Sequence, residues 1–125
     1  YAKADVWPLA PEGEILVVIQ CEDVQAIENL PSILKEVPGI GVVLIGEGDL
    51  SQELGYPRQY DHPVVADAIN SILAICKENN VPCGHPHPDT QNTARLIEEG
   101  YRFLMPGSGR SYAALDQGRT LTGRE

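Results

Sequence analysis

The chain alternates short apolar runs with segments of helical character, and this order limits the folds open to it. The runs lie at residues 14–20, 39–46, 80–87 and 101–105, and a stretch that predicts a helix follows each one. The first two, EILVVIQ and GIGVVLIG, are apolar almost throughout, which is typical of parallel strands buried on both faces. The sequence therefore predicts a parallel α/β architecture built from strand–helix units.

Helix signals differ in strength along the chain. The strongest segment, residues 63–79, begins with a proline and carries its apolar residues on one face. Asp23 suits a helix cap, and Pro31 suits the first turn of a separate short helix. The other helices are expected at residues 24–30, 31–37, 90–99 and 108–118. Residues 1–14 predict a connecting segment, and residues 46–61 predict a long polar loop.

The length of the chain suits part of a larger barrel. A (β/α)₈ barrel takes roughly 250 residues, and this chain has 125. An open four-stranded sheet is the alternative, but the runs carry no sign of a protected edge strand. Residues 1–125 are therefore predicted to be one partial domain, the C-terminal four βα units of a TIM barrel.

Charge and cysteine content exclude several classes of partner. The formal net charge is −9, which disfavours nucleic acid because an acidic surface repels phosphates. The three cysteines have no paired spacing, so reduced thiols and a cytoplasmic location are expected. No apolar run approaches the roughly 20 residues that cross a bilayer, so no membrane association is expected.

Two carboxylates follow the first two apolar runs. Glu22 comes after the first run and Asp49 after the second, and parallel neighbours bring their carboxyl ends to one edge of a sheet. Two carboxylates can hold a hard divalent cation while leaving room for substrate. Gln20 points the same way as Glu22 by the period of a strand, and Gly48 lets backbone approach an anion. Spacing alone leaves helix capping or a solvated loop as the alternative.

Three segments resemble the HpcH/HpaI aldolase family. They are VVIQCEDVQAIENL (17–30), GVVLIGEGDLSQELG (41–55) and HPVVADAI (62–69), and the resemblance extends over about residues 5–118. The family comprises class II pyruvate-dependent aldolases, with relatives among citrate-lyase-type and malyl-CoA-type lyases. The resemblance implies a TIM barrel, a small keto acid substrate and a homo-oligomer.

The resemblance also implies roles for particular residues. Glu22 and Asp49 match the ligands of a divalent cation, Mg²⁺, Mn²⁺ or Co²⁺. Gln20 matches a residue that contacts the bound keto acid. Gly48 matches the position whose backbone N–H binds the pyruvate carboxylate, so Gly48 and Asp49 are both expected at the substrate.

The implied reaction is the cleavage of a 4-hydroxy-2-oxo acid to pyruvate and an aldehyde through a metal-stabilised enolate. The catalytic residues remain unknown in this chain, since the family takes its His and substrate-binding Arg from the N-terminal half of the barrel. Two alternatives stay open: a non-catalytic fragment or assembly module of such a barrel, and a CoA-thioester lyase of the citrate or malyl-CoA type.

Several residues depart from the family pattern or invite other interpretations. Many members carry proline where this chain has Glu47, which is expected to face solvent, although a place behind the metal ligands or a role in substrate selection is an alternative. Cys83, His85 and His87 alternate in a way that allows a separate metal site, a pocket-lining His85, or histidines that are structural or exposed. Residues 106–111, with Arg110, allow a site for a distal anion of the substrate.

Overall fold

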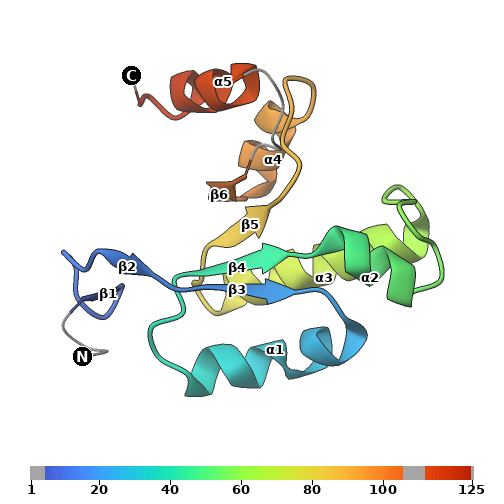
Figure 1. Ribbon diagram of the computed structural model, residues 1–125, viewed down its shortest axis with the longest axis horizontal. Helices are drawn as coiled ribbons and strands as arrows, with labels where there is room; N and C mark the ends of the chain where they lie inside the picture. Colours follow the sequence, from blue (N-terminus) through green and yellow to red (C-terminus); the bar gives the residue numbers. More distant parts are fainter. Residues whose placement is uncertain (1–4, 106–111, 125) are drawn as a thin grey trace.

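A parallel sheet with strand order β3-β4-β5-β6 organises the computed structural model, which describes residues 5–105 and 112–124 (Figure 1). The strands are β3 (Val18–Cys21), β4 (Val42–Ile45), β5 (Cys83–His85) and β6 (Phe103–Leu104). The helices are α1 (Val24–Glu36), α2 (Glu47–Glu53), α3 (Pro63–Glu78), α4 (Thr93–Glu99) and α5 (Ala113–Leu121). Two short parallel strands, β1 (Val6–Trp7) and β2 (Ile15–Leu16), precede the sheet. The predicted alternation of four parallel strands with helices is therefore confirmed, whereas β1 lies in a segment that was expected to be a connection only.

The core lies between the sheet and helices α1 and α3. Val43 and Ile45 of β4 are fully buried, and so are Ile72 and Cys76 of α3, in one cluster with Leu30 of α1. The stripe of apolar residues predicted for residues 63–79 is thus the face with which α3 contacts β4 and β5. Burial of this stripe anchors the sheet that carries the candidate site.

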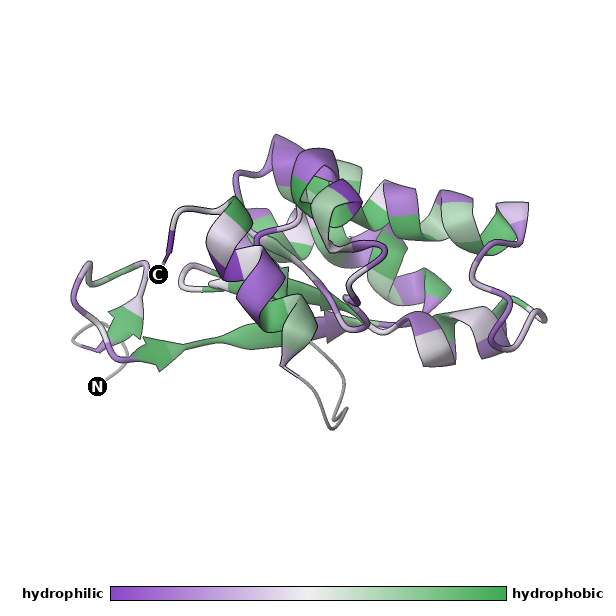
Figure 2. Ribbon diagram, turned by 90° about the horizontal axis from the view of Figure 1, so that it is seen from above, coloured by the Kyte–Doolittle hydropathy of each residue, from purple (hydrophilic) through white to green (hydrophobic). Residues whose placement is uncertain are grey.

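The prediction that both early strands are buried on both faces is right for β4 and wrong for β3. All of β4 is buried, whereas Val18 of β3 is 39 % exposed. Ile15 and Leu16 of the preceding strand β2 are 45 % and 44 % exposed. The ribbon of β2 and β3, coloured mostly as hydrophobic, runs along one side of the molecule in Figure 2. The physical reason is topological: among the described residues, β3 pairs with β4 alone and forms an edge of the sheet.

Helix α1 is continuous where two short helices were expected. Asp23 caps it, since its side chain accepts a hydrogen bond of 2.6 Å from the backbone N–H of Ala26. Pro31 lies inside the helix rather than at a helix start. Its missing N–H removes one helical hydrogen bond, but the helix continues because Leu30 is buried in the core and Ile33 packs against it.

Helix α2 occupies the first part of the expected polar loop, so that expectation is wrong for Glu47–Glu53. Leu50 and Ser51 are both fully buried in it, and the backbone N–H of Leu50 donates to the carbonyl of Gly46 at 3.0 Å. Ser51 Oγ donates to the Gly48 carbonyl at 2.7 Å. The glycines and acidic residues of this segment predict a loop, but a helix forms because Leu50 is buried in the core.

The final helix also differs from its predicted bounds. Helix α5 runs from Ala113 to Leu121, so it continues beyond the expected end at residue 118. Residues 108–111 of the predicted helix, and the whole segment 106–111 with Arg110, lie outside the described residues. None of the described residues of α5 is buried, and its two leucines, Leu115 and Leu121, are 43 % and 51 % exposed.

Candidate active site

The register of β3 and β4 brings the two predicted acidic motifs to one edge of the sheet. Cys21 pairs with Ile45 at the end of the strands, and the backbone N–H of Gly46 donates to the Cys21 carbonyl at 2.8 Å. Glu22 and Gly46, the next residue after each strand, therefore lie side by side. The predicted meeting of the two strand ends is confirmed.

Gly46 is the point of closest approach between these strand ends. A Cβ placed on Gly46 would lie 2.4 Å from Glu22 Cβ and 2.9 Å from Gln20 Nε2. Gln20 Nε2 in turn donates to Glu22 Oε2 at 2.6 Å, so the two side chains share a side as the period of the strand predicts. The absent side chain at Gly46 is what lets this pair lie against the start of α2.

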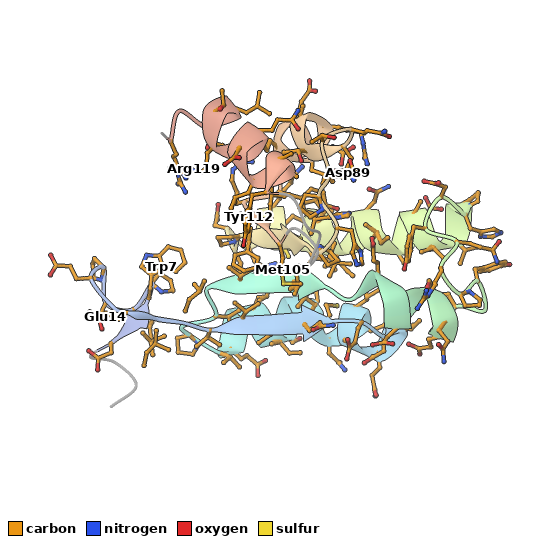
Figure 3. All side chains as sticks on the ribbon, turned by 45° about the horizontal axis from the view of Figure 1, so that its top comes forward. Trp7, Glu14, Asp89, Met105, Tyr112 and Arg119 are labelled. Carbon is orange, nitrogen blue, oxygen red and sulfur yellow. The ribbon has the colours of Figure 1, made fainter. Side chains whose placement is uncertain are left out.

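Asp49 and Gly48 project from the first turn of α2. Both are exposed, and the space where a Gly48 side chain would stand is open, with no atom within 4 Å. Gln20, Gly48 and Asp49 line one pocket of about 230 Å³ together with Met105. Met105, at the end of β6, lies beside β4 in Figure 3. Glu22 does not line this pocket and reaches it through its contact with Gln20.

The donor set suits a hard divalent cation. Glu22 and Asp49 offer carboxylate oxygens from neighbouring strand ends, and Mg²⁺ and Mn²⁺ commonly take one or two carboxylates and fill their other positions with water and substrate. Within residues 5–105 and 112–124, no group of three His, Cys, Asp or Glu side chains could hold a metal by itself. A cation here would thus depend on substrate, water or further residues for its remaining ligands.

Glu47 is buried, so the expectation that it faces solvent is wrong. Its side chain is only 4 % exposed, and its Oε1 lies within hydrogen-bond distance of His87 Nδ1. Its Oε2 lies 3.6 Å from His85 Nε2. The carboxylate turns inward because two imidazoles at the end of β5 meet it there, which offsets the cost of burying its charge. No local sequence pattern predicts the contact between Glu47 and His87, because the two residues are 40 positions apart.

His85 completes this cluster as a partly buried, neutral ring. Burial lowers its pKa below the usual 6.5, and its ring packs edge-on against Tyr101 with centroids 5.2 Å apart. His85 Nδ1 accepts the backbone N–H of His87 at 3.2 Å. The proton of the neutral ring therefore sits on Nε2, which faces Glu47. A second cavity of about 500 Å³ is lined by Glu47, His85 and His87 and by Tyr60 and Arg95 among others.

The alternating Cys83, His85 and His87 do not gather into a metal cluster among the described residues. Cys83 is instead buried against Cys76 of α3, and this contact together with burial raises its pKa. Cys21 is a core residue as expected, and burial raises its pKa to about 12. All three thiols are free.

Comparison with known proteins decides the family. The sequence model described as HpcH/HpaI aldolase/citrate lyase matches residues 10–113. The chain belongs to this family. It is 32 % identical over 112 residues to the 4-hydroxy-2-oxo-heptane-1,7-dioate aldolase of Escherichia coli, a match that covers 85 % of this chain and 42 % of that protein. The resemblance stated from the sequence is thereby confirmed.

Two further HpcH/HpaI relatives support the same placement. The 5-keto-4-deoxy-D-glucarate aldolase of Salmonella newport is 30 % identical over 94 residues, which cover 75 % of this chain and 36 % of that protein. An HpcH/HpaI family protein of Burkholderia cenocepacia superposes with a TM-score of 0.72 at 25 % identity, covering 88 % of this chain and 42 % of the other. The predicted fold class, a parallel βα architecture that is part of a TIM barrel, is confirmed. The chain spans about two fifths of the length of these relatives.

None of the helices in the described parts of the chain combines the length and the apolar character that crossing a membrane requires.

Proposed function

We propose that this chain is the metal-binding and pyruvate-binding part, the C-terminal half, of an aldolase that cleaves 4-hydroxy-2-oxo acids to pyruvate and an aldehyde. One observation carries the proposal: Gln20, Gly48 and Asp49 line a single pocket, and Gln20 holds Glu22 against Gly46 at the same strand ends. The names of the two aldolase relatives, which both denote oxo acid substrates, support the substrate class.

Each residue of the pocket has a distinct task in this proposal. Gln20 Nε2 already donates to Glu22 at 2.6 Å, and an amide carries a second N–H that can donate to an oxygen of the keto acid. Gly48 lies in the first turn of α2, where backbone N–H groups have no partner within the helix, so its N–H can donate to the pyruvate carboxylate. The open space at Gly48 leaves room for that carboxylate.

Glu22 and Asp49 would hold the divalent cation, Mg²⁺ or Mn²⁺ and also Co²⁺. When bound, the cation supplies Lewis acidity that stabilises negative charge developing on the keto oxygen of the substrate. The exposed position of Asp49 and the partly exposed position of Glu22 keep their oxygens available for this task.

The chemistry requires groups beyond this chain. As the C3–C4 bond of the substrate breaks, its electron pair passes into the enolate of pyruvate, and the 4-hydroxyl loses its proton to a base. That base and a substrate-binding Arg are expected from the N-terminal half of the barrel. In this chain, Gln20 and the N–H of Gly48 keep the pyruvate portion in place while the bond breaks.

Cellular setting and assembly follow the same proposal. Three free buried thiols support a cytoplasmic location. Exposed apolar residues on and beside α5, Tyr112, Leu115 and Leu121, support a homo-oligomer in which this helix contacts a neighbouring subunit.

A citrate-lyase-type reaction on a CoA thioester is the second candidate, because the family description covers citrate lyase as well as aldolase. Cleavage of a thioester substrate by the complete enzyme, without cleavage of a 4-hydroxy-2-oxo acid, would favour it over the aldolase. A non-catalytic assembly module would cleave neither substrate.

Variants of the two carboxylates test the metal site. In the complete enzyme, Glu22→Ala and Asp49→Ala should each lower Mn²⁺ affinity and reduce metal-dependent cleavage by about 10²-fold or more, because each removes an anionic ligand. Calorimetry with Mn²⁺, with and without pyruvate, measures the binding, and a pyruvate-coupled assay measures cleavage.

Matched controls are available on exposed faces of helices. Asp67→Ala on α3 and Glu98→Ala on α4 remove the same charges away from the pocket, and both should behave like the unchanged enzyme. Full cleavage activity in Glu22→Ala or Asp49→Ala would refute the metal assignment.

A further inference from the structure

The pair formed by Glu47 and His87 lies between two cavities, the smaller pocket with Gln20 and the larger cavity with Tyr60. Both residues line the pocket that holds Gln20, Gly48 and Asp49, and both also line the larger cavity beside α3 and α4. Neither residue has a role in the proposed handling of pyruvate or metal. The side chain of Glu47 is nevertheless only 4 % exposed. Burying a carboxylate costs free energy unless a hydrogen-bond partner compensates it, so the carboxylate is expected to hold such a partner in place.

The backbone around His87 is held from several sides. Pro86 and Pro88 on either side of it are buried. Its N–H donates to His85 Nδ1 at 3.2 Å, and its carbonyl accepts from Asn92 Nδ2 at 3.1 Å. The His87 side chain, in contrast, is 58 % exposed. A fixed backbone therefore presents an accessible imidazole at the border of the pocket.

Glu47 determines which ring nitrogen of His87 carries the proton. An ionised carboxylate only accepts hydrogen bonds, so ionised Glu47 places the proton of the His87 ring on Nδ1, the nitrogen that its Oε1 contacts. In the neutral ring Nε2 is then a bare acceptor. The ring of Tyr60 lies nearly parallel to that of His87, with centroids 6.3 Å apart, on the side of the larger cavity.

We propose that His87 determines specificity for the aldehyde portion of the substrate by accepting, through Nε2, a hydrogen bond from a hydroxyl group of that portion. Glu47 is the positioning residue that holds the ring in this tautomer and orientation. The inference rests on the proposed aldolase function, because it needs pyruvate to occupy the neighbouring positions at Gln20 and Gly48.

The charges around His87 favour a hydroxyl over an anion. Asp49 shares the smaller pocket with it, and Asp61 and Asp89 line the larger cavity. Arg95 also lines the larger cavity, but its guanidinium is paired with Glu99 at 2.6 Å. An anionic group beside these carboxylates meets repulsion, whereas a neutral hydroxyl donates to Nε2 without that cost. A site that accepts a hydrogen bond from a substrate hydroxyl discriminates against the analogue without it, because the acceptor is then left unpaired.

Aldol addition of pyruvate to two aldehydes measures this discrimination in the complete enzyme. Glycolaldehyde carries a hydroxyl and acetaldehyde does not, and the readout is the ratio of their kcat/KM values within each variant at about pH 8. We expect the unchanged enzyme to favour glycolaldehyde by roughly 10-fold or more. His87→Phe keeps an aromatic ring beside Tyr60 and loses the acceptor, so its ratio should fall close to one.

Variants of Glu47 separate positioning from bulk. Glu47→Gln retains an oxygen that accepts from Nδ1 and should keep most of the ratio. Glu47→Leu should lower the ratio, and adding it to His87→Phe should lower the ratio no further, because the two residues act as one unit. The ¹⁵N chemical shifts of His87 in the unchanged protein provide a measurement that needs no variant, and they should show the proton on Nδ1.

A matched histidine serves as control. His62 lies at the start of α3, stacked on Tyr56 with centroids 3.5 Å apart and outside both cavities. His62→Phe should leave the ratio at the value of the unchanged enzyme. The proposed role of His87 would be overturned if His87→Phe kept the ratio of the unsubstituted enzyme, or if the unsubstituted enzyme showed no preference between the two aldehydes. It would also be overturned if the ¹⁵N shifts placed the proton of His87 on Nε2. None of these outcomes would contradict the proposed aldolase function. No Mn²⁺-dependent exchange of the pyruvate methyl protons in D₂O and no product with either aldehyde would overturn the proposed function and the inference with it.

Discussion

At the scale of single residues, the absence of one side chain positions the candidate metal ligands. Gln20, Glu22 and Gly46 belong to neighbouring strand ends, and the pair of side chains occupies the space that a side chain at Gly46 would need. Gly48, two residues further on, has free space around it. The two glycines of the same loop therefore serve different purposes, one in packing and one in access to the pocket.

Substitutions by alanine should separate the two glycines. Gly46→Ala places a methyl group 2.4 Å from Glu22 Cβ, so it should lower the free energy of unfolding by about 1–3 kcal/mol and weaken Mn²⁺ binding. Gly48→Ala, inside α2, should leave stability unchanged or raise it by up to about 1 kcal/mol, since alanine is the better helix former. Urea unfolding of the complete enzyme measures both, and equal losses would contradict the packing role of Gly46.

The partly buried His85 predicts a dependence of stability on pH. Burial lowers its pKa in the folded protein below the 6.5 of an exposed histidine, so the unfolded chain binds a proton at higher pH than the folded one. The resulting contribution to stability is present above pH 6.5 and is lost as the pH falls from 6.5 through the lower pKa of the folded protein. Urea unfolding between pH 8 and pH 5 should show stability declining, and the decline should be smaller in His85→Gln. An identical profile in this variant would exclude His85 as the cause.

At the scale of elements, helix α2 shows how tertiary contacts override local composition. Its sequence, EGDLSQE, contains glycine and four acidic or amide side chains and predicts a loop. Leu50 is nevertheless fully buried, and Ser51 Oγ accepts from the backbone N–H of Arg58 at 2.9 Å while donating to the Gly48 carbonyl. The helix is thus held from its buried side, and its opposite side presents Asp49.

Removal of the buried anchor should loosen this helix. Leu50→Ala should lower the free energy of unfolding by about 2–5 kcal/mol, the usual cost of emptying a buried leucine site, and should weaken Mn²⁺ binding because Asp49 loses its fixed position. Leu54→Ala, at the partly exposed end of the same helix, should cost less and leave Mn²⁺ affinity nearly unchanged. Similar losses in both variants would argue that α2 is not held by Leu50.

At the scale of the whole molecule, the sheet is open. Strand β3 is an edge of the sheet with exposed apolar residues in it and just before it, Ile15, Leu16 and Val18. An exposed apolar edge invites pairing with another strand. In the relatives, a chain of more than twice this length carries the matching segment, so further barrel strands are the expected cover for this edge.

Residues 1–125 produced alone should therefore associate or aggregate. Sedimentation velocity should show species larger than the 13.6 kDa monomer, and Val18→Lys, which places a charge on the open edge, should reduce them. Asp67→Lys on the exposed face of α3 provides a control that adds the same cation away from the edge. A stable, monodisperse monomer in the unchanged chain would indicate a complete small domain instead of part of a barrel.

Local pattern determined much of this protein. The apolar runs around Val43 and Ile45 established parallel strands, the stripe through Ile72 and Cys76 established α3, and the period of β3 placed Gln20 beside Glu22. The motifs around Glu22 and Asp49 identified the family. These features were accessible because each depends on residues close together in the sequence, or on the rule that parallel neighbours end at one edge.

Tertiary structure alone decided the rest. Glu47 turned out to be buried because His85 and His87, about 40 residues away, meet its carboxylate. Helix α2 formed because Leu50 reaches the core, and β3 is exposed because no strand among the described residues covers its outer edge. Each outcome depends on which residues distant in the sequence contact a site and on the free energy of burying them. A local sequence pattern contains no information on either.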